Sequence, residues 1–145
     1  MTRVDFYLTQ DLSAQQRNFT ACRLIEKVFR LGHHVYIHTD DDEQAKQLDD
    51  LLWTFHNISF VPHCCAEVNS STANYSKVVI GQQHHLDAKH DVLINLASEI
   101  PVFFTRFERV AEIVGGQDVE REASRERFRF YRDRGYALET HQLTK

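Results

Sequence analysis

The stretch VDFYLTQDLSAQQRNFTACRLIEKVFRLG, residues 4–32, decides the fold class together with the segment that follows it. Residues 4–8 alternate and are rich in strand formers, so they predict a first strand. Ser13 and Gln16 form a capping box that predicts the start of a helix, apolar residues then recur at helical spacing, and Gly32 is a natural terminator. This stretch therefore predicts a strand followed by an amphipathic helix.

The continuation HHVYIHTDDDEQAKQLDDLLWTF, residues 33–55, repeats the pattern. Residues 35–38 predict a second strand. Thr39 or Asp40 is the expected cap of a second helix, and the acidic residues of its first turn complement the helix dipole. The order of elements up to this point is strand, helix, strand, helix.

The rest of the chain supplies further strands and one more helix. A final helix is predicted from about Gln117 to Arg134, stopped by Gly135, and polar loops are expected at 66–75 and 82–90. The further strand candidates are 58–61, 78–80, 92–94 and 109–114.

Helices interleaved with apolar strands predict an α/β fold: an open, mainly parallel sheet with helices on both faces, in one domain spanning residues 1–145. Folds of this Rossmann-like type bind ligands beyond the carboxyl ends of their strands. The first strand-to-helix turn, residues 8–13, contains no glycine, and the first glycine of the chain is Gly32. A phosphate-binding loop is therefore absent from this turn, which argues against a nucleotide site.

Composition excludes several other classes. With 145 residues and 42% hydrophobic content, the chain can bury one hydrophobic core. A formal net charge of −4 argues against a protein coated with positive charge for nucleic acid. Three cysteines without a CxxC pair favour neither a disulfide scaffold nor structural zinc. Without a membrane span or secretory signal, the protein is expected to be cytoplasmic.

The search for an active site leaves weak candidates. The acids Asp40–Asp42 follow a strand and could bind a metal or a ribose, although a capped helix start explains them more simply. His63, Cys64 and Cys65 offer metal-ligand types, but neighbouring side chains of an extended chain point to opposite faces. No nucleophile, base and orienting acid can be assembled, so neither catalysis nor a cofactor is predicted.

The last predicted helix carries an arginine stripe. Like charges one turn apart repel, so such a stripe is either a solvated surface or a site that receives an anion. Arginine binds carboxylates bidentately and an aromatic ring adds an apolar contact, which suits an acidic peptide with an apolar anchor or a nucleic-acid backbone. The pattern leaves both readings open. The residues on this one face are Arg121, Arg125, Phe128, Arg129 and Arg132.

A second candidate surface contains Trp53 and Phe60. Trp53 lies off the apolar stripe of the second helix, which is typical of an aromatic anchor for a partner protein. A tryptophan that covers the edge of the sheet explains the same position equally well. Both interpretations stay open.

Six segments carry a family resemblance that runs in order from Val4 to Tyr136. They are VDFYL, VYIHTDDDEQAKQLDDLLW, SFVPH, DVLINL, FERVAEIV and RERFRFYRDRGY. Together they resemble the chi subunit of bacterial DNA polymerase III. The resemblance implies a non-catalytic accessory subunit of the clamp-loader assembly, without a cofactor, whose α/β domain is similar to nucleotide-binding folds but has no phosphate loop.

The resemblance also implies two partners. One is the psi subunit, which forms a heterodimer with chi and would contact Trp53 and Phe60. The other is the acidic C-terminal tail of single-stranded-DNA-binding protein, which ends in an apolar residue and a free carboxylate. The implied tail-binding residues are Arg121, Arg125, Phe128 and Arg129, with Val114 as an apolar neighbour.

Familiar chi sequences carry lysine at the positions of Arg121 and Arg129 and tyrosine at that of Phe128, so charge is kept and a hydroxyl is lost. Tight direct binding of bare nucleic acid is not expected, because one arginine stripe meets few phosphates. The rival hypothesis is a metal- or nucleotide-dependent enzyme that uses Asp40–Asp42.

Overall fold

The computed structural model describes residues 2–9, 14–54, 64–65, 78–82 and 91–143, and for 14–16, 53–54, 64–65 and 143 it describes the backbone alone. The elements are β1 (Arg3–Thr9), α1 (Ala14–Arg30), β2 (Val35–His38), α2 (Asp42–Thr54), β3 (Cys64–Cys65), β4 (Val78–Gly81), β5 (Val92–Asn95), the short 3-10 helix η1 (Phe104–Arg106), β6 (Arg109–Val114), α4 (Asp118–Asp133) and β7 (Ala137–Leu143).

The described strands form one open sheet in the order β3-β4-β2-β5-β6-β1-β7, and every pairing among them is parallel. β1 pairs with β6 on one side and with β7 on the other, and it therefore lies at the centre of the three strands next to α4. The predicted α/β class with a mainly parallel sheet is therefore confirmed.

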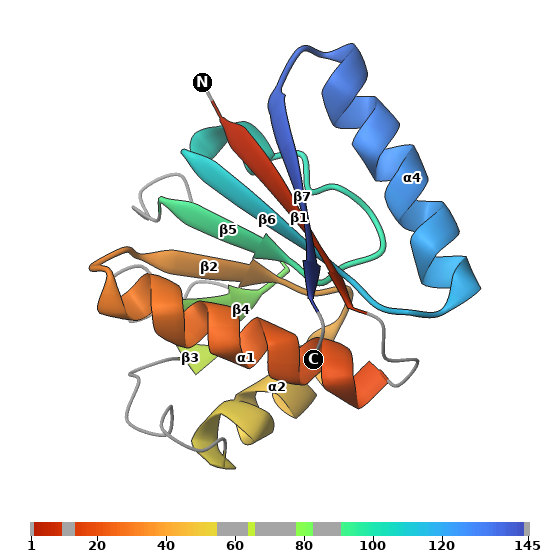
Figure 1. Ribbon diagram of the computed structural model, residues 1–145. Coiled ribbons are helices and arrows are strands. Elements are labelled where there is room, and N and C mark those ends of the chain that lie inside the picture. Colours follow the sequence, from red (N-terminus) through yellow and green to blue (C-terminus); the bar gives the residue numbers. More distant parts are fainter. Residues whose placement is uncertain (1, 10–13, 55–63, 66–77, 83–90, 144–145) are drawn as a thin grey trace.

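Side chains alternate between two apolar layers, as the period of a strand requires. In β2, Ile37 belongs to a core formed with α1 and α2, whereas Tyr36 belongs to a second core formed with α4 and η1. Figure 1 shows α1 running along β2 and β4, α2 lying next to α1 near β3, and α4 running beside β7 and β1. The helices thus cover both faces, as predicted.

Helix ends agree with the sequence in one case and differ in another. Gly32 has φ +89°, and the backbone N–H of His33 donates to the Val28 carbonyl, which closes α1 with the expected glycine. For α2 the predicted cap, Thr39 or Asp40, is wrong. Asp41 Oδ1 accepts the Gln44 backbone N–H at 2.8 Å, because its carboxylate stands three residues before that orphan donor. The predicted cap of α1, Ser13, lies outside the described residues.

Among the strands, the predictions at 78–80, 92–94 and 109–114 are confirmed by β4, β5 and β6, whereas 58–61 lies outside the described residues. The sequence analysis missed β7. Its side chains are mostly exposed, because it pairs with β1 at the end of the sheet, and so it has no apolar alternation to reveal it. The polar loop expected at 66–75 also lies outside the described residues.

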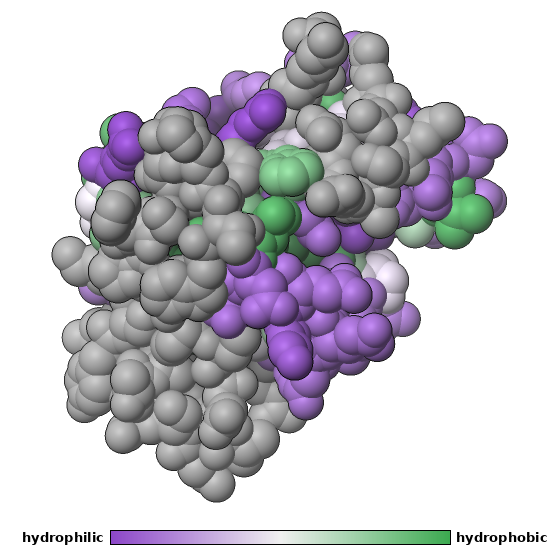
Figure 2. Space-filling view, turned by 90° about the horizontal axis from the view of Figure 1, so that it is seen from below, coloured by the Kyte–Doolittle hydropathy of each residue, from purple (hydrophilic) through white to green (hydrophobic). Residues whose placement is uncertain are grey.

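Among the described residues the exposed large hydrophobic side chains are Leu31, Val102 and Val119. In Figure 2 the hydrophobic residues form small separate groups within a largely hydrophilic surface, as far as the coloured atoms extend. Among the described helices none combines the length and apolarity that crossing a membrane requires.

Candidate functional site

A groove lies between α4 and the strands β1 and β7. Its volume is about 240 Å³, below the roughly 300–1,000 Å³ of small-molecule pockets, so it suits one large side chain with its neighbouring backbone. The residues that line it are Phe6, Leu8, Arg121, Ser124, Arg125, Phe128 and Thr140.

The apolar part of the groove is part of the second core. Phe128 is half-buried and its ring centre lies 5.4 Å from that of Phe6, which is itself buried in β1. Leu8, two residues further along the same strand face, extends this floor. Aromatic pairs at this separation stabilise the position of both rings. The apolar surface is therefore preformed.

Two arginines border the groove and differ in their contacts. Arg121 donates from Nη2 to the Thr9 carbonyl at 3.0 Å, which holds its guanidinium at the end of β1. Arg125 is exposed and has no hydrogen bond or ion pair to any other residue that the structure describes. The Arg125 guanidinium is thus the rim cation that is available to an anion.

The structure brings together three of the five residues predicted for the tail site, namely Arg121, Arg125 and Phe128. Arg129 lies one turn further along α4, exposed and paired with Glu126 at 3.2 Å, and it does not line the groove. Val114 is 1% exposed, pairs with Leu8 on the neighbouring strand and belongs to the same core layer, so it lies beside the groove floor without lining the groove. The sequence analysis missed the floor residues contributed by β1 and β7.

A buried charge network fixes α4 over the sheet. Arg127 Nε donates to Glu112 Oε1 at 3.0 Å, while Tyr131 and Asn95 donate to Glu112 Oε2 at 2.8 and 2.9 Å. Burial and the neighbouring Glu112 carboxylate both raise the pKa of Tyr131, which keeps its hydroxyl protonated as a donor. An acid among the apolar residues that follow Arg109 in the strand RVAEIV was the signal that could have revealed Glu112.

At the carboxyl ends of β5 and β6, where related folds bind nucleotides, the structure places an arginine of α1. Arg17 donates to the carbonyls of Ile113 and Leu96, at 3.1 and 2.9 Å. Burial is the largest influence on this group and lowers its pKa. The side chain therefore satisfies backbone acceptors of the sheet at this edge.

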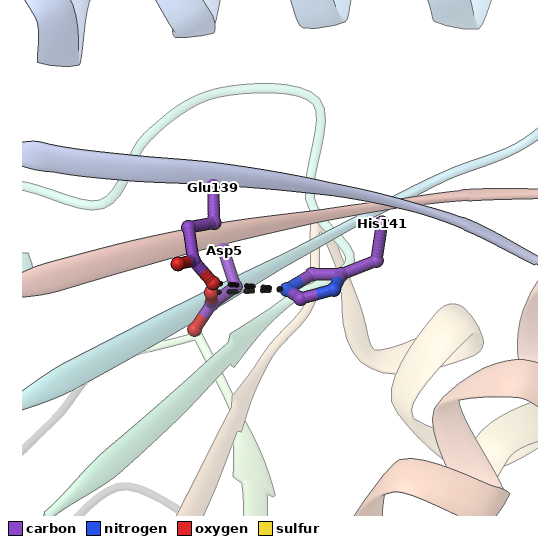
Figure 3. A group of neighbouring side chains, drawn as sticks. All are labelled: Asp5, Glu139 and His141. Carbon is purple, nitrogen blue, oxygen red and sulfur yellow. Dashed lines mark hydrogen bonds and ion pairs between the residues drawn. The ribbon is translucent and has the colours of Figure 1, made fainter.

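Within the part of the chain that the structure describes, one group of side chains has metal-ligand chemistry: Asp5, Glu139 and His141, with ligand atoms within 4.8 Å of one another (Figure 3). Arginines already neutralise both carboxylates, because Arg109 Nε lies 2.7 Å from Asp5 and Arg3 Nη2 lies 2.5 Å from Glu139. Burial alone would raise the pKa of Asp5, but the hydrogen bonds from Arg109 and His141 outweigh it and lower the pKa. The arrangement is an ion-pair cluster that joins β1, β6 and β7.

The acids of the rival enzyme hypothesis have structural partners. Asp40 Oδ1 accepts hydrogen bonds from the backbone and hydroxyl of Ser98, at 3.0 and 3.1 Å, and Asp41 caps α2. Asp42 lies in the exposed first turn of that helix. Their geometry is that of a helix start tied to the loop after β5.

The two residues predicted to face psi cannot be compared with the structure. The backbone of Trp53 lies in the last turn of α2, and its side chain is outside the described part. Phe60 lies outside the described residues altogether. Their role stays a prediction.

The fold and the groove define an open, all-parallel α/β protein with a basic, aromatic-lined groove beside one helix. Residues 1–139 match the family described as DNA polymerase III chi subunit, HolC. The chain belongs to this family. It is a bacterial replication protein and a non-catalytic accessory subunit of the DNA polymerase III holoenzyme.

Full-length relatives support the assignment. The chain is 41% identical over 145 residues to the DNA polymerase III subunit chi of Pseudomonas aeruginosa, covering 100% of this chain and 99% of the relative. It is 30% identical to the chi subunit of Escherichia coli (strain K12), with 97% of both chains covered. The chi subunit of Haemophilus influenzae is 28% identical, with 95% of both chains covered.

Proposed function

We propose that this chi subunit links the replicase to the acidic C-terminal tail of single-stranded-DNA-binding protein. The observation that carries the proposal is the exposed Arg125 guanidinium at the rim of an apolar groove built from Phe6, Leu8 and Phe128. A tail that ends in an apolar side chain and a carboxylate needs both features side by side, because the apolar side chain requires an apolar floor and the carboxylate requires a bidentate donor.

The proposed site is composed of Arg121, Arg125 and Phe128 in the groove, Arg129 one turn further along the helix and Val114 next to Leu8 in the core. Phe128 lacks a hydroxyl, so it contributes ring contact alone. Within the groove, Thr140 offers a hydroxyl from β7 on the opposite wall.

The second proposed link is to psi, through Trp53 and Phe60. Binding of psi would connect this domain, residues 1–145, to the clamp-loader complex. The assembly would act in the cytoplasm, at the replication fork. α2, which carries Trp53, packs in the first core, whereas α4 packs in the second, on the opposite face of the sheet. Separate faces favour simultaneous binding of both partners.

The test is calorimetry of the purified protein with a synthetic acidic peptide ending in proline-phenylalanine. Arg125→Ala should weaken binding about ten- to a hundredfold, since one charge-assisted contact contributes about 1.5–3 kcal/mol. Added salt should weaken wild-type binding. Arg134→Ala is the matched control, because Arg134 is the C-cap residue of the same helix, covers the Phe130 ring and does not line the groove.

Unchanged affinity in an Arg125→Ala variant with native circular dichroism would refute the proposal. A labelled single-stranded oligonucleotide provides the second arm. Micromolar binding of that oligonucleotide at about 150 mM salt would mean that the arginines contact nucleic acid directly, in place of the tail.

A further inference from the structure

The charge along α4 changes sign from its first turn to its last. On the face that contains Arg125, Asp118 and Glu122 lie toward the N-terminal end, and Arg129 and Arg132 lie toward the C-terminal end. Arg121 also lies on the N-terminal side, but its guanidinium is hydrogen-bonded to the Thr9 carbonyl and the two acids outnumber it. The groove occupies the middle of the helix, at Arg121 to Phe128. A ligand in the groove thus has an acidic neighbourhood on one side and a basic one on the other.

Arg129 and Arg132, which we call the distal arginines, are available to a ligand. The side chains of Arg129 and Arg132 are 57% and 60% exposed. Arg129 pairs with Glu126 at an N···O distance of 3.2 Å and Arg132 with Asp133 at 3.4 Å, and both carboxylates are more exposed than the arginines. Exposed pairs of this kind contribute at most about 1 kcal/mol, so a stronger anion can replace the partner. Arg134 is occupied differently, since its guanidinium lies 3.6 Å from the centre of the Phe130 ring and donates to the Phe130 carbonyl.

Arg127 takes no part in this surface. Its side chain is 8% exposed and is paired with the fully buried Glu112. The basic surface beyond the groove is therefore made by the distal arginines, Arg129 and Arg132.

From this gradient we infer the direction of the bound peptide, an inference that rests on the proposed function. The apolar C-terminal residue occupies the groove, and the preceding acidic residues run toward the C-terminal end of α4, over the distal arginines. The opposite direction would place those acids against Asp118 and Glu122, where like charges repel. The negative end of the helix dipole amounts to only about half a charge, which two arginines outweigh.

Helix geometry sets which acid reaches which arginine. Arg132 follows Arg125 by seven residues, about 10 Å along the helix axis. An extended peptide covers about 3.3 Å per residue. The acid about three positions before the residue bound at Arg125 therefore lies opposite Arg132. Arg132 is then a specificity-determining residue that favours tails with an acid at this position.

A double-mutant cycle tests the direction. The probe is a synthetic peptide that ends in proline-phenylalanine and has aspartates three to five positions before its last residue, with variants in which asparagine replaces the aspartates or an amide replaces the terminal carboxylate. Arg132→Gln should weaken the acidic peptide about two- to fivefold and should leave the asparagine peptide unaffected. Arg134→Gln is the matched control and should show no such coupling.

Two outcomes overturn the direction: coupling of Arg132 to the terminal carboxylate, or coupling of the peptide aspartates to Glu122→Gln without coupling to Arg132. These results are distinguishable from failure of the proposed function. If Arg125→Ala still weakens binding while Arg132 shows no coupling, the direction is wrong and the site stands. If Arg125→Ala changes nothing, the site itself is wrong.

Discussion

Arg125 and Arg127 stand two residues apart on α4 and have opposite environments. Arg125 faces the groove and is exposed, whereas the Arg127 side chain is 8% exposed against a Glu112 that is fully buried. Taking two charges out of water is costly, and the neighbouring donors Tyr131 and Asn95 offset part of that cost by completing the hydrogen bonds of the carboxylate. At this scale one arginine is available to the ligand that we propose, and the other stabilises the fold.

At the residue scale we predict that Glu112→Gln lowers the free energy of unfolding by about 3–5 kcal/mol, because it leaves the Arg127 guanidinium buried without a counter-charge. Urea denaturation measures the effect. Glu126→Gln is the matched control: it removes the carboxylate partner of another α4 arginine, but that pair is exposed, so the loss should stay below about 1 kcal/mol. Equal losses in the two variants would show that burial does not distinguish these pairs.

At the scale of elements, the ion-pair cluster on β1 explains how β7 is held at the end of the sheet. Asp5 accepts from Arg109 of β6 and lies 3.2 Å from His141 of β7, while the ring of His141 stacks on Tyr7 at 4.8 Å. Because β7 also supplies Thr140 to the groove, the cluster contributes to the shape of the groove from the opposite face of the sheet.

The lowered pKa of Asp5 predicts a loss of stability in acid. A carboxyl whose folded pKa lies below its ordinary value of 3.8 stabilises the fold above that value, and the contribution disappears as pH falls through the folded pKa. The difference in free energy of unfolding between wild type and Asp5→Asn should therefore be largest near pH 6 and should shrink steadily below about pH 4.

Urea denaturation at a series of pH values gives this difference. Arg109→Gln is the companion variant, because it keeps the carboxylate and removes its strongest hydrogen-bond donor, and it should flatten the acid dependence as well. A constant difference between wild type and Asp5→Asn across the series would contradict the account.

At the scale of the whole molecule, the sheet separates two surfaces. α2 packs near β3 and β4 at one end, and α4 packs on the other face near β6 and β7 at the opposite end (Figure 1). The adaptor role that we propose would benefit from such a separation, because neither partner would cover the site of the other.

We predict that Trp53→Ala and Phe60→Ala each weaken association with psi, by about 2 kcal/mol or more, and leave binding of the acidic peptide unchanged. Co-purification with psi, alongside calorimetry with the peptide, measures both. Arg125→Ala is the reciprocal control and should retain psi. A melting curve accompanies each variant, and a variant that unfolds would assign its residue to the core.

Local pattern was enough to predict most elements of this protein. Strands such as Val78–Gly81 and Val92–Asn95 are short apolar runs, and α1 ends at a glycine with positive φ, so their signals lie within a few neighbouring residues. The α4 stripe is of the same kind, because helical periodicity alone places Arg121, Arg125 and Phe128 on one face. The sequence determined the fold class, the last helix and the core of the candidate site by such short-range patterns.

Tertiary structure alone decided the features that depend on distant parts of the chain. Asp5 meets Arg109 across 104 residues and His141 across 136, and only the sheet order brings these strands together. β7 is a strand because β1 offers it backbone partners, although its own side chains are mostly exposed. Burial of Arg127 depends on Glu112 of a different element. Periodicity describes the face of one element, whereas these contacts arise only when elements pack.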